Sequence, residues 1–265
     1  MSAFLGPIHK WLFRKIEIQE ELVRVIVKIG EEEYGISDLN QLVDNKFGTL
    51  ETGQLEDIID GKNIHGWLQQ RISLVERRLA FATVTVLEDD PARINKICEK
   101  IRDYGKTISV NSDKSLKETY VFLEDLLLNG MPCDRVNQIT CETEEEISWE
   151  QTVDIHEEYW KSLGGEVKYY YLIRESLING TLYSSPYEFY KKTENEYVLK
   201  NRRNKMVTKD MILGDLLREN ANAAEVLMSC GMHCLGCPSA QMESIEDACA
   251  VHGLDVEEVL AKLNA

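Results

Sequence analysis

Two long stretches near the amino terminus constrain the fold of this chain more than any other feature. In residues 8–29, and again in residues 64–87, apolar side chains recur every three or four positions. This spacing puts them on one face of an α-helix, so each stretch predicts an amphipathic helix that buries that face. We expect the first helix to end near Gly30, because glycine commonly terminates helices.

The same two stretches also match at four of five consecutive residues. Ile8–Leu12 reads IHKWL and Ile64–Leu68 reads IHGWL, and the same shift aligns Glu20 with Glu76. One interpretation is an internal repeat of two packed helices, in which His9 and His65 occupy equivalent places. The other is that these letters coincide by chance.

The rest of the chain alternates helical and β-prone segments up to a polar break. Helices are expected at 91–104, 115–129, 156–163 and 166–178, and β-hairpins at 136–153 and 188–200. The polar run Asn201–Lys205 is the expected domain boundary. The predicted fold class is α+β: a mainly helical domain with short β-hairpins at 1–200, and a small all-α domain at 206–265.

Charge and hydropathy exclude two classes of partner. The formal net charge of -16 repels phosphate backbones and anionic membrane surfaces, so we expect no nucleic acid and no membrane. We see no secretion signal at the amino terminus, and no apolar stretch approaches the roughly 20 residues of a membrane span. The expected location is the cytoplasm, where cysteines are more often reduced, catalytic or metal-bound than paired structurally.

Cysteines cluster in the small domain. Four of the seven cysteines lie between Cys230 and Cys249. Pro238 suits the first position of a helix, which would place Cys237 at the helix cap, where free amides and the helix dipole stabilise a thiolate. Cys234 is three residues away, within reach of a disulfide. Cys249 shares a helical stripe with apolar residues, so we expect it to face inward.

This region resembles a known family. The similarity spans about 206–264 and is carried by Leu213–Leu217, Ala224–Leu227, Gly231–Cys237 and Val251–Asp255. These strings look like the disulfide domain associated with hybrid cluster proteins, usually found in anaerobes, and Glu246–Cys249 is more distantly similar to the amino-terminal domain of iron–sulfur repair proteins. The resemblance implies an all-helical fold and a redox pair at Cys234 and Cys237, but no substrate. At position 212 this chain has isoleucine where the family commonly has a helix-capping threonine. We expect Asp210 or a neighbour to open the helix that carries Leu213.

Three interpretations of the cysteines remain open at the level of sequence. The pair can be a dithiol/disulfide switch with Cys237 as the nucleophile, or all of the thiols can be inert. Alternatively, Cys230, Cys234, Cys237 and Cys249 can ligate an iron–sulfur cluster or zinc. His233 is a candidate fourth ligand or a candidate proton acceptor for a cysteine, and a histidine bonded only to the backbone is the simpler alternative.

A second candidate site lies in the larger domain. His9, His65, His156, Glu20 and Glu76 would form a metal or ligand site if the repeated helices present them inward. The simpler alternative is that these side chains fill the core and its rim. The run Tyr169–Tyr171 can likewise line a pocket or pack in the core.

We therefore expect a thiol-redox protein, or an electron-transfer accessory, of an anaerobic cytoplasm that uses Cys234 and Cys237 on a redox protein partner. The alternative is a small-molecule or metal sensor with a cluster held by the cysteines. The sequence leaves open the identity of any enzyme, the need for any cofactor and the oligomeric state, for which a homodimer is one option.

Overall fold

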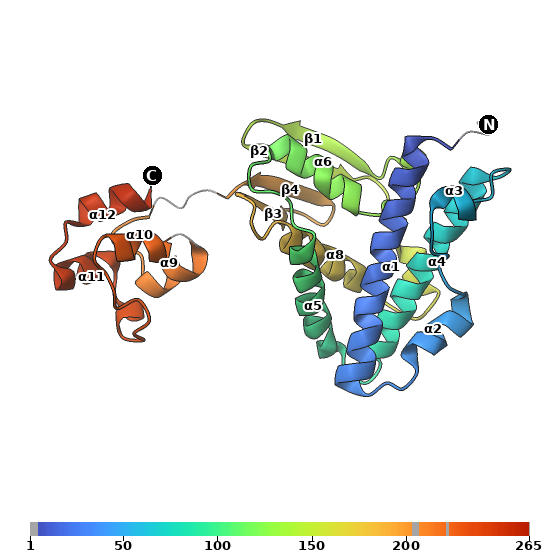
Figure 1. Cartoon of the computed structure of the whole chain (residues 1–265), viewed down its shortest axis with the longest axis horizontal. Coiled ribbons are helices and arrows are strands. Elements are labelled where there is room, and N and C mark those ends of the chain that lie inside the picture. The colour runs from blue at the N-terminus through green and yellow to red at the C-terminus, as the bar shows by residue number, and fades with distance from the viewer. Residues whose placement is uncertain (1–4, 203–206, 221–222, 265) are drawn as a thin grey trace. The chain divides into compact units, whose positions relative to one another are not determined.

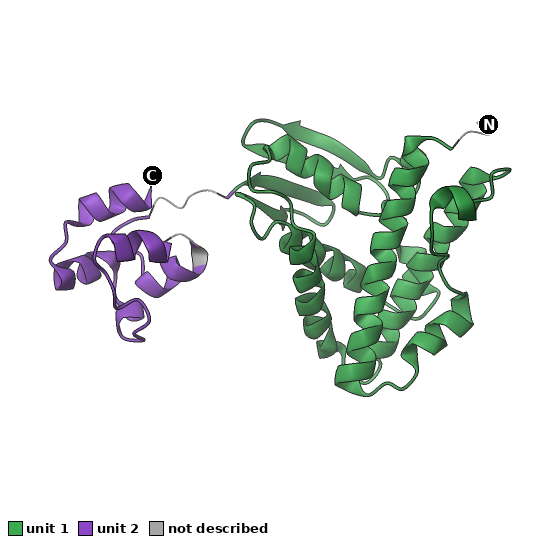
Figure 2. Cartoon of the chain, in the orientation of Figure 1, with its two compact units in different colours: residues 1–201 green, residues 202–265 purple. Residues whose placement is uncertain are grey.

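The chain forms two compact units. The structure is a computed structural model that describes residues 5–202, 207–220 and 223–264. The larger unit covers residues 1–201 and the smaller unit residues 202–265 (Figure 2). Among the described residues, no helix combines the length and the apolarity that a membrane span requires.

The larger unit combines helices with a four-stranded sheet that lies at one side of them (Figure 1). Its helical elements are α1 (Pro7–Tyr34), α2 (Leu39–Phe47), α3 (Leu55–Ile58), α4 (Ile64–Leu87), η1 (Pro91–Arg93), α5 (Ile94–Thr107), α6 (Leu116–Leu126), η2 (Pro132–Asp134), α7 (Glu157–Lys161) and α8 (Lys168–Thr181). The α+β class and the mainly helical character of this region are confirmed. The short helices α2 and α3 are additions that the periodicity did not predict.

The predicted end of the first helix is wrong. Helix α1 continues past Gly30 and stops at Gly35, which has a φ of 65° and donates its N–H to the Gly30 carbonyl. Gly30 serves packing instead: a Cβ at this position would lie 2.5 Å from a methyl carbon of Leu39. The missing side chain therefore lets α2 approach α1 closely.

Helices α1 and α4 lie side by side and run parallel. His9 meets His65, Gln19 meets Glu76 and Glu20 meets Arg78, so each contact joins residues separated by 56 to 58 positions. The matching histidines face each other, whereas Gln19 and Glu20 contact residues one and two positions beyond their counterparts. The internal repeat stays an interpretation of the sequence.

The two predicted hairpins form and join into one sheet. Strands β1 (Asn137–Glu142) and β2 (Glu146–Gln151) form the first hairpin, and β3 (Tyr187–Lys191) and β4 (Glu196–Asn201) form the second. The strand order is β1-β2-β4-β3, and all pairs are antiparallel. Trp149 on β2 stacks with Phe189 and Tyr197, so the junction between the hairpins has an aromatic core.

The smaller unit is all-helical around its own apolar core. Its elements are α9 (Leu213–Glu219), α10 (Ala223–Ser229), η3 (Ala240–Met242), α11 (Ile245–His252) and α12 (Val256–Leu263). Ser244 and Asp255 accept hydrogen bonds from backbone amides at the starts of α11 and α12, and Gly253 ends α11 with a φ of 66°. These three helix boundaries match the predicted caps.

The predicted cap of α9 is wrong. Ile212, and not Asp210, is the N-cap residue of this helix, and it makes no side-chain capping bond. The backbone of Ile212 instead bridges to Ser244, and Leu213 donates its N–H to Glu243. The start of α9 is therefore held by the strand-like segment in front of α11 rather than by a polar side chain.

Candidate functional site

The cysteine loop of the smaller unit runs from the end of α10 to η3. It leaves the helix at Gly231, whose φ of 103° is accessible mainly to glycine, and is anchored by Met232, which is 1 % exposed. Next, Cys237 donates its N–H to the Cys234 carbonyl over 3.0 Å, which closes a turn. The α-carbons of such a turn lie within about 7 Å, a separation that overlaps the roughly 4.4–6.8 Å across a disulfide.

Cys237 caps the helical turn that follows it. Its carbonyl accepts the N–H of Gln241 over 3.0 Å, with Pro238 directly after the cap. Hydrogen bonds from the backbone amides of Ala240 and Ser239 lower the pKa of the Cys237 thiol. Both Cys234 and Cys237 are exposed. The capping predicted from Pro238 thus has a geometric counterpart, although the 3-10 helix itself starts only at Ala240.

The other candidates of this region lie in different environments. Cys249 is 1 % exposed in the core of the smaller unit, where burial, followed by the neighbouring Cys230, raises the pKa of its thiol. Cys230 is half-buried against the same core, whereas His233 is exposed.

In this structure the four cysteines are not arranged as one ligand set. Ligands must converge on one point, but Cys249 faces the core while Cys234 and Cys237 face the solvent. Throughout the described ranges, no three or more His, Cys, Asp or Glu side chains are grouped so that they could hold a metal ion.

The second predicted site separates into three pairs. His9 and His65 lie at one end of the α1–α4 pair with their Nε2 atoms 3.2 Å apart. Glu20 and Glu76 lie eleven residues further along, about 16 Å at the rise of an α-helix, so they cannot share a ligand with those histidines. The prediction of a single site built from all five residues is therefore wrong.

His9 and His65 are joined by a hydrogen bond, and the contact from Gly6 indicates which ring nitrogen of His9 carries the proton. Gly6 donates its N–H to His9 Nδ1 over 2.9 Å, so the neutral His9 ring carries its proton on Nε2. That proton points to His65 Nε2, which accepts it. Ligation of a metal by His9 Nε2 would require this proton to leave and the bond from Gly6 to break.

Both predicted carboxylates are buried with polar partners that sequence reasoning missed. The Glu20 carboxylate accepts two hydrogen bonds from the guanidinium of Arg78. Arg78 also donates to the Asp44 carboxylate and to the Gly48 carbonyl. Glu76 accepts from Gln19 over 2.8 Å and lies 3.1 Å from His156 Nδ1. No sequence motif marks Arg78 or Gln19, because their role depends on the helix facing them.

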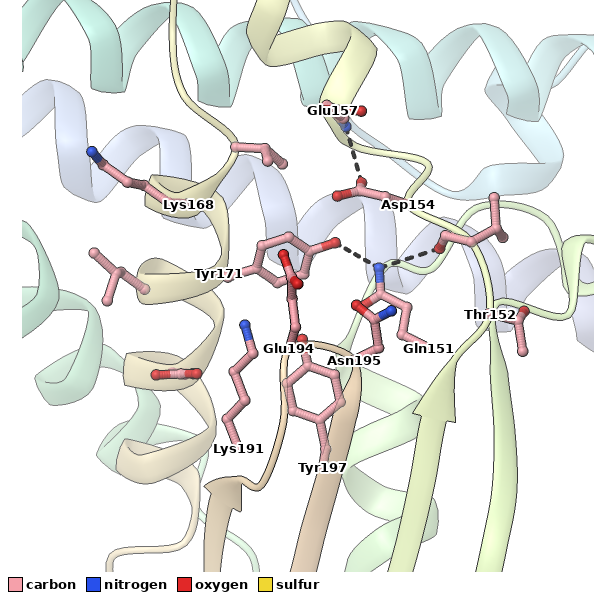
Figure 3. Close-up of a pocket in the computed structure, with 14 residues that line it drawn as sticks. Gln151, Thr152, Asp154, Glu157, Lys168, Tyr171, Lys191, Glu194, Asn195 and Tyr197 are labelled. Carbon is pink, nitrogen blue, oxygen red and sulfur yellow. Dashed lines mark hydrogen bonds between the residues drawn. The ribbon is translucent and has the colours of Figure 1, made fainter.

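A cleft in the larger unit brings together segments that the sequence pointed to separately. It has a volume of about 630 Å³ and lies between α8, the end of β2 and the β3–β4 turn (Figure 3). Tyr171, from the tyrosine run on α8, lines this cleft, whereas Tyr170 is buried and stacks on His156 with ring centroids 3.8 Å apart. The two interpretations of the tyrosines, pocket and core, therefore apply to neighbouring residues.

Comparison with known proteins found a family match within the smaller unit. Residues 207–260 match the family model described as a domain of unknown function (DUF1858). The chain has no significant match to a curated protein and none to a solved structure.

Proposed function

We propose that the smaller unit is a dithiol/disulfide redox module in which Cys237 is the nucleophile and Cys234 the resolving thiol. One observation carries the proposal: the exposed thiol of Cys237 accepts hydrogen bonds from backbone amides at the start of a helical turn. The backbone N–H of the same residue is bonded to the carbonyl of Cys234, a second exposed cysteine. This arrangement favours the thiolate, which is the reactive form.

The surface around the pair suits a protein partner. No Lys, Arg, Asp or Glu occurs between Met228 and Met242, and Met242 is 79 % exposed beside the helical turn that Cys237 caps. A surface with few charges and some apolar area can approach a partner while stripping little water from charges, although Glu243, directly after this segment, acts on the Cys237 thiol. We propose a redox partner protein in a reducing cytoplasm, in keeping with the resemblance to the domain associated with hybrid cluster proteins.

The proposed reaction is a two-step thiol–disulfide exchange. The Cys237 thiolate attacks one sulfur of a substrate disulfide, and the other substrate sulfur leaves as a thiolate that takes up a proton. Cys234 then loses its proton to solvent and attacks Cys237 Sγ, which releases the second substrate sulfur as a thiolate that is protonated in turn. The protein pair is oxidised to a disulfide, and the substrate disulfide is reduced to two thiols.

Alkylation of the reduced full-length protein tests the proposal. At neutral pH, iodoacetamide should label Cys237 at least about tenfold faster than Cys249, because the pKa values of the two thiols move in opposite directions and Cys249 is buried. Cys237→Ser should remove the fast phase, whereas the matched Cys249→Ala should keep it. Equal rates at the two cysteines would refute the capping argument.

A redox titration separates the switch from inert thiols. In glutathione buffers the parent protein should show one two-electron transition, detected as the loss of two hydrogens by mass spectrometry. Cys234→Ser and Cys237→Ser should each abolish this transition, and Cys230→Ser should leave it. If a chelator is needed before any cysteine reacts, the alternative of an iron–sulfur or zinc sensor replaces the switch.

A further inference from the structure

The cleft of the larger unit has the size and shape of a small-molecule site. Its volume of about 630 Å³ falls within the roughly 300–1,000 Å³ of typical ligand pockets. One wall is the outward face of α8, and the opposite side is formed by the end of β2 and by the β3–β4 turn (Figure 3). Nothing in the thiol chemistry of the smaller unit accounts for it.

Carboxylates dominate the polar lining. Asp154, Glu175 and Glu194 line the cleft, and none of the three forms an ion pair among the described residues. Asp154 Oδ1 accepts the backbone N–H groups of two residues at the start of α7, which leaves its negative charge without a counterion. The fourth carboxylate, Glu157, is paired with Lys161 outside the cleft lining.

The two lysines of the lining are not equivalent. Lys168 is paired with Glu166 over 2.8 Å and extends away from Tyr171 in Figure 3. Lys191 points toward Tyr171, with its Nζ 5.7 Å from the ring centroid, and is thus the one cation of the described lining that faces the cleft. Three carboxylates that form no ion pair outnumber the one ammonium that faces the cleft, so the cleft favours a cationic guest.

Apolar and aromatic surface lies beside these charges. Val153 and Leu172 are 44 % and 40 % exposed. The ring of Tyr171 also lines the cleft, next to Lys191 (Figure 3). Covering exposed aliphatic side chains with a ligand removes apolar surface from water, which lowers the free energy, and aromatic faces attract cations. The lining therefore suits a molecule with an apolar body as well as a charge.

A buried amide at the floor lacks one hydrogen bond. Gln151 is 7 % exposed; its Nε2 donates to the Tyr171 hydroxyl and to the Val153 carbonyl. Its Oε1 has no hydrogen-bond partner among the described residues, which is costly for a buried acceptor. The oxygen is covered by its neighbours, so a ligand N–H reaches it only after the amide rotates.

We infer that this cleft binds a small organic amine, whose ammonium is attracted by the carboxylates of the lining, Asp154, Glu175 and Glu194, and whose apolar body covers Val153, Leu172 and the Tyr171 ring. The cation adds positive charge to a lining in which these carboxylates outnumber the ammonium of Lys191. Burial raises the pKa of the Glu175 carboxyl, and a bound ammonium opposes that shift as Lys191 already does.

Three probes of nearly equal shape test the inference on the full-length protein. In calorimetric titrations, 2-phenylethylamine should bind and its affinity should fall as salt is added, because the attraction is electrostatic. The neutral 2-phenylethanol should bind at least about tenfold more weakly, the loss of roughly 1.4 kcal/mol, and the anionic 3-phenylpropanoate should bind more weakly still.

Matched variants locate the binding. Glu175→Gln should weaken the amine at least about fivefold, and Lys191→Gln should strengthen it, because each changes the charge that faces the cleft. Lys168→Gln is the control and should change the affinity less than about twofold, since this lysine is already paired with Glu166. Circular dichroism checks that each variant keeps its helical content.

Two results would overturn the inference. One is equal or tighter binding of 3-phenylpropanoate, which would assign the cleft to anions through Lys191. The other is amine binding that is the same in Glu175→Gln as in the parent, which would place the binding elsewhere on this acidic chain.

Discussion

The cysteine loop and the α1–α4 pair position their polar groups in different ways. In the loop, the hydrogen bonds of Cys237 join it to residues within four positions along the chain, from Cys234 to Gln241. In the helix pair, the polar contacts between α1 and α4 join residues 56 to 58 positions apart. Local hydrogen bonds can thus be predicted from spacing, whereas contacts between helices depend on their packing and register.

The two regions should also respond differently to substitution. The thiols of Cys234 and Cys237 are exposed, so replacing either residue changes the reactivity of the loop with little effect on folding. Glu20, Glu76 and Arg78 are buried, and a buried charge that loses its partner destabilises the fold. All four tryptophans lie in the larger unit, so their fluorescence follows the unfolding of this unit alone.

The largest effect is expected where the helix pair buries its ion pair. Arg78→Met leaves the Glu20 carboxylate buried without a partner and should lower the free energy of unfolding by about 3–5 kcal/mol. Denaturant titration followed by tryptophan fluorescence measures the loss. The exposed pair of Arg24 and Glu21 provides the control: Arg24→Met should change the stability by less than about 0.5 kcal/mol. Equal losses would remove the contrast between buried and local contacts.

A close approach between α5 and α8 should give the next largest effect. A Cβ on Gly180 would lie 2.2 Å from the Arg102 carbonyl oxygen, so Gly180→Ala forces the two backbones apart. We expect a loss of about 2–3 kcal/mol in the same fluorescence-detected titration. Gly61→Ala, where a Cβ meets nothing within 4 Å, should be close to neutral. A neutral Gly180→Ala would show that the helices separate without strain.

Lys15 should show the reverse sign, because its burial opposes folding. It is 3 % exposed, and desolvation lowers the pKa of its ammonium to about 8, against the opposing charges of Glu124 and Asp125. Between about pH 8 and 10 the unfolded chain binds more protons than the folded chain, so the contribution of Lys15 to stability rises with pH.

Lys15→Met should therefore stabilise the larger unit by about 1–2 kcal/mol at pH 7. The gain over the parent should shrink as the pH rises toward 10, when the lysine of the parent becomes neutral. Unfolding titrations of both proteins at pH 7 and pH 10 measure this difference. A gain that grows with pH would contradict the assigned direction of the pKa.

The smallest effect is expected at a local cap in the smaller unit. Ser244→Ala removes the bond from the Asp247 amide at the start of α11 and should destabilise that helix by about 1 kcal/mol. Hydrogen exchange of the α11 amides measures the loss, and the tryptophan-detected transition should not move. A shift of that transition would mean that the stability of one unit depends on the other.

Sequence reasoning worked best where a structure is closed by its near neighbours. The bounds of α4, the caps at Ser244 and Asp255 and the turn from Cys234 to Cys237 all depend on residues a few positions apart. It failed at Gly30, which looks like a helix terminator, because Leu39 of another helix occupies the space that a side chain would need. It failed at Ile212 for the same reason, since the start of α9 is held by the segment around Glu243 and Ser244.

For the candidate sites, the sequence by itself pointed to Cys234 and Cys237 and to the turn that joins them. The repeat of the histidine segments predicted equivalent places for His9 and His65, and the structure brings their Nε2 atoms within 3.2 Å. Only the tertiary structure decided that Glu76 would face His156, that Cys249 would be buried while Cys234 and Cys237 are exposed, and that α8 and the second hairpin would line a cleft. The physical reason is range: hydrogen bonds within one turn are set by backbone geometry, whereas contacts between distant segments exist only once the apolar faces of the helices and strands have packed together.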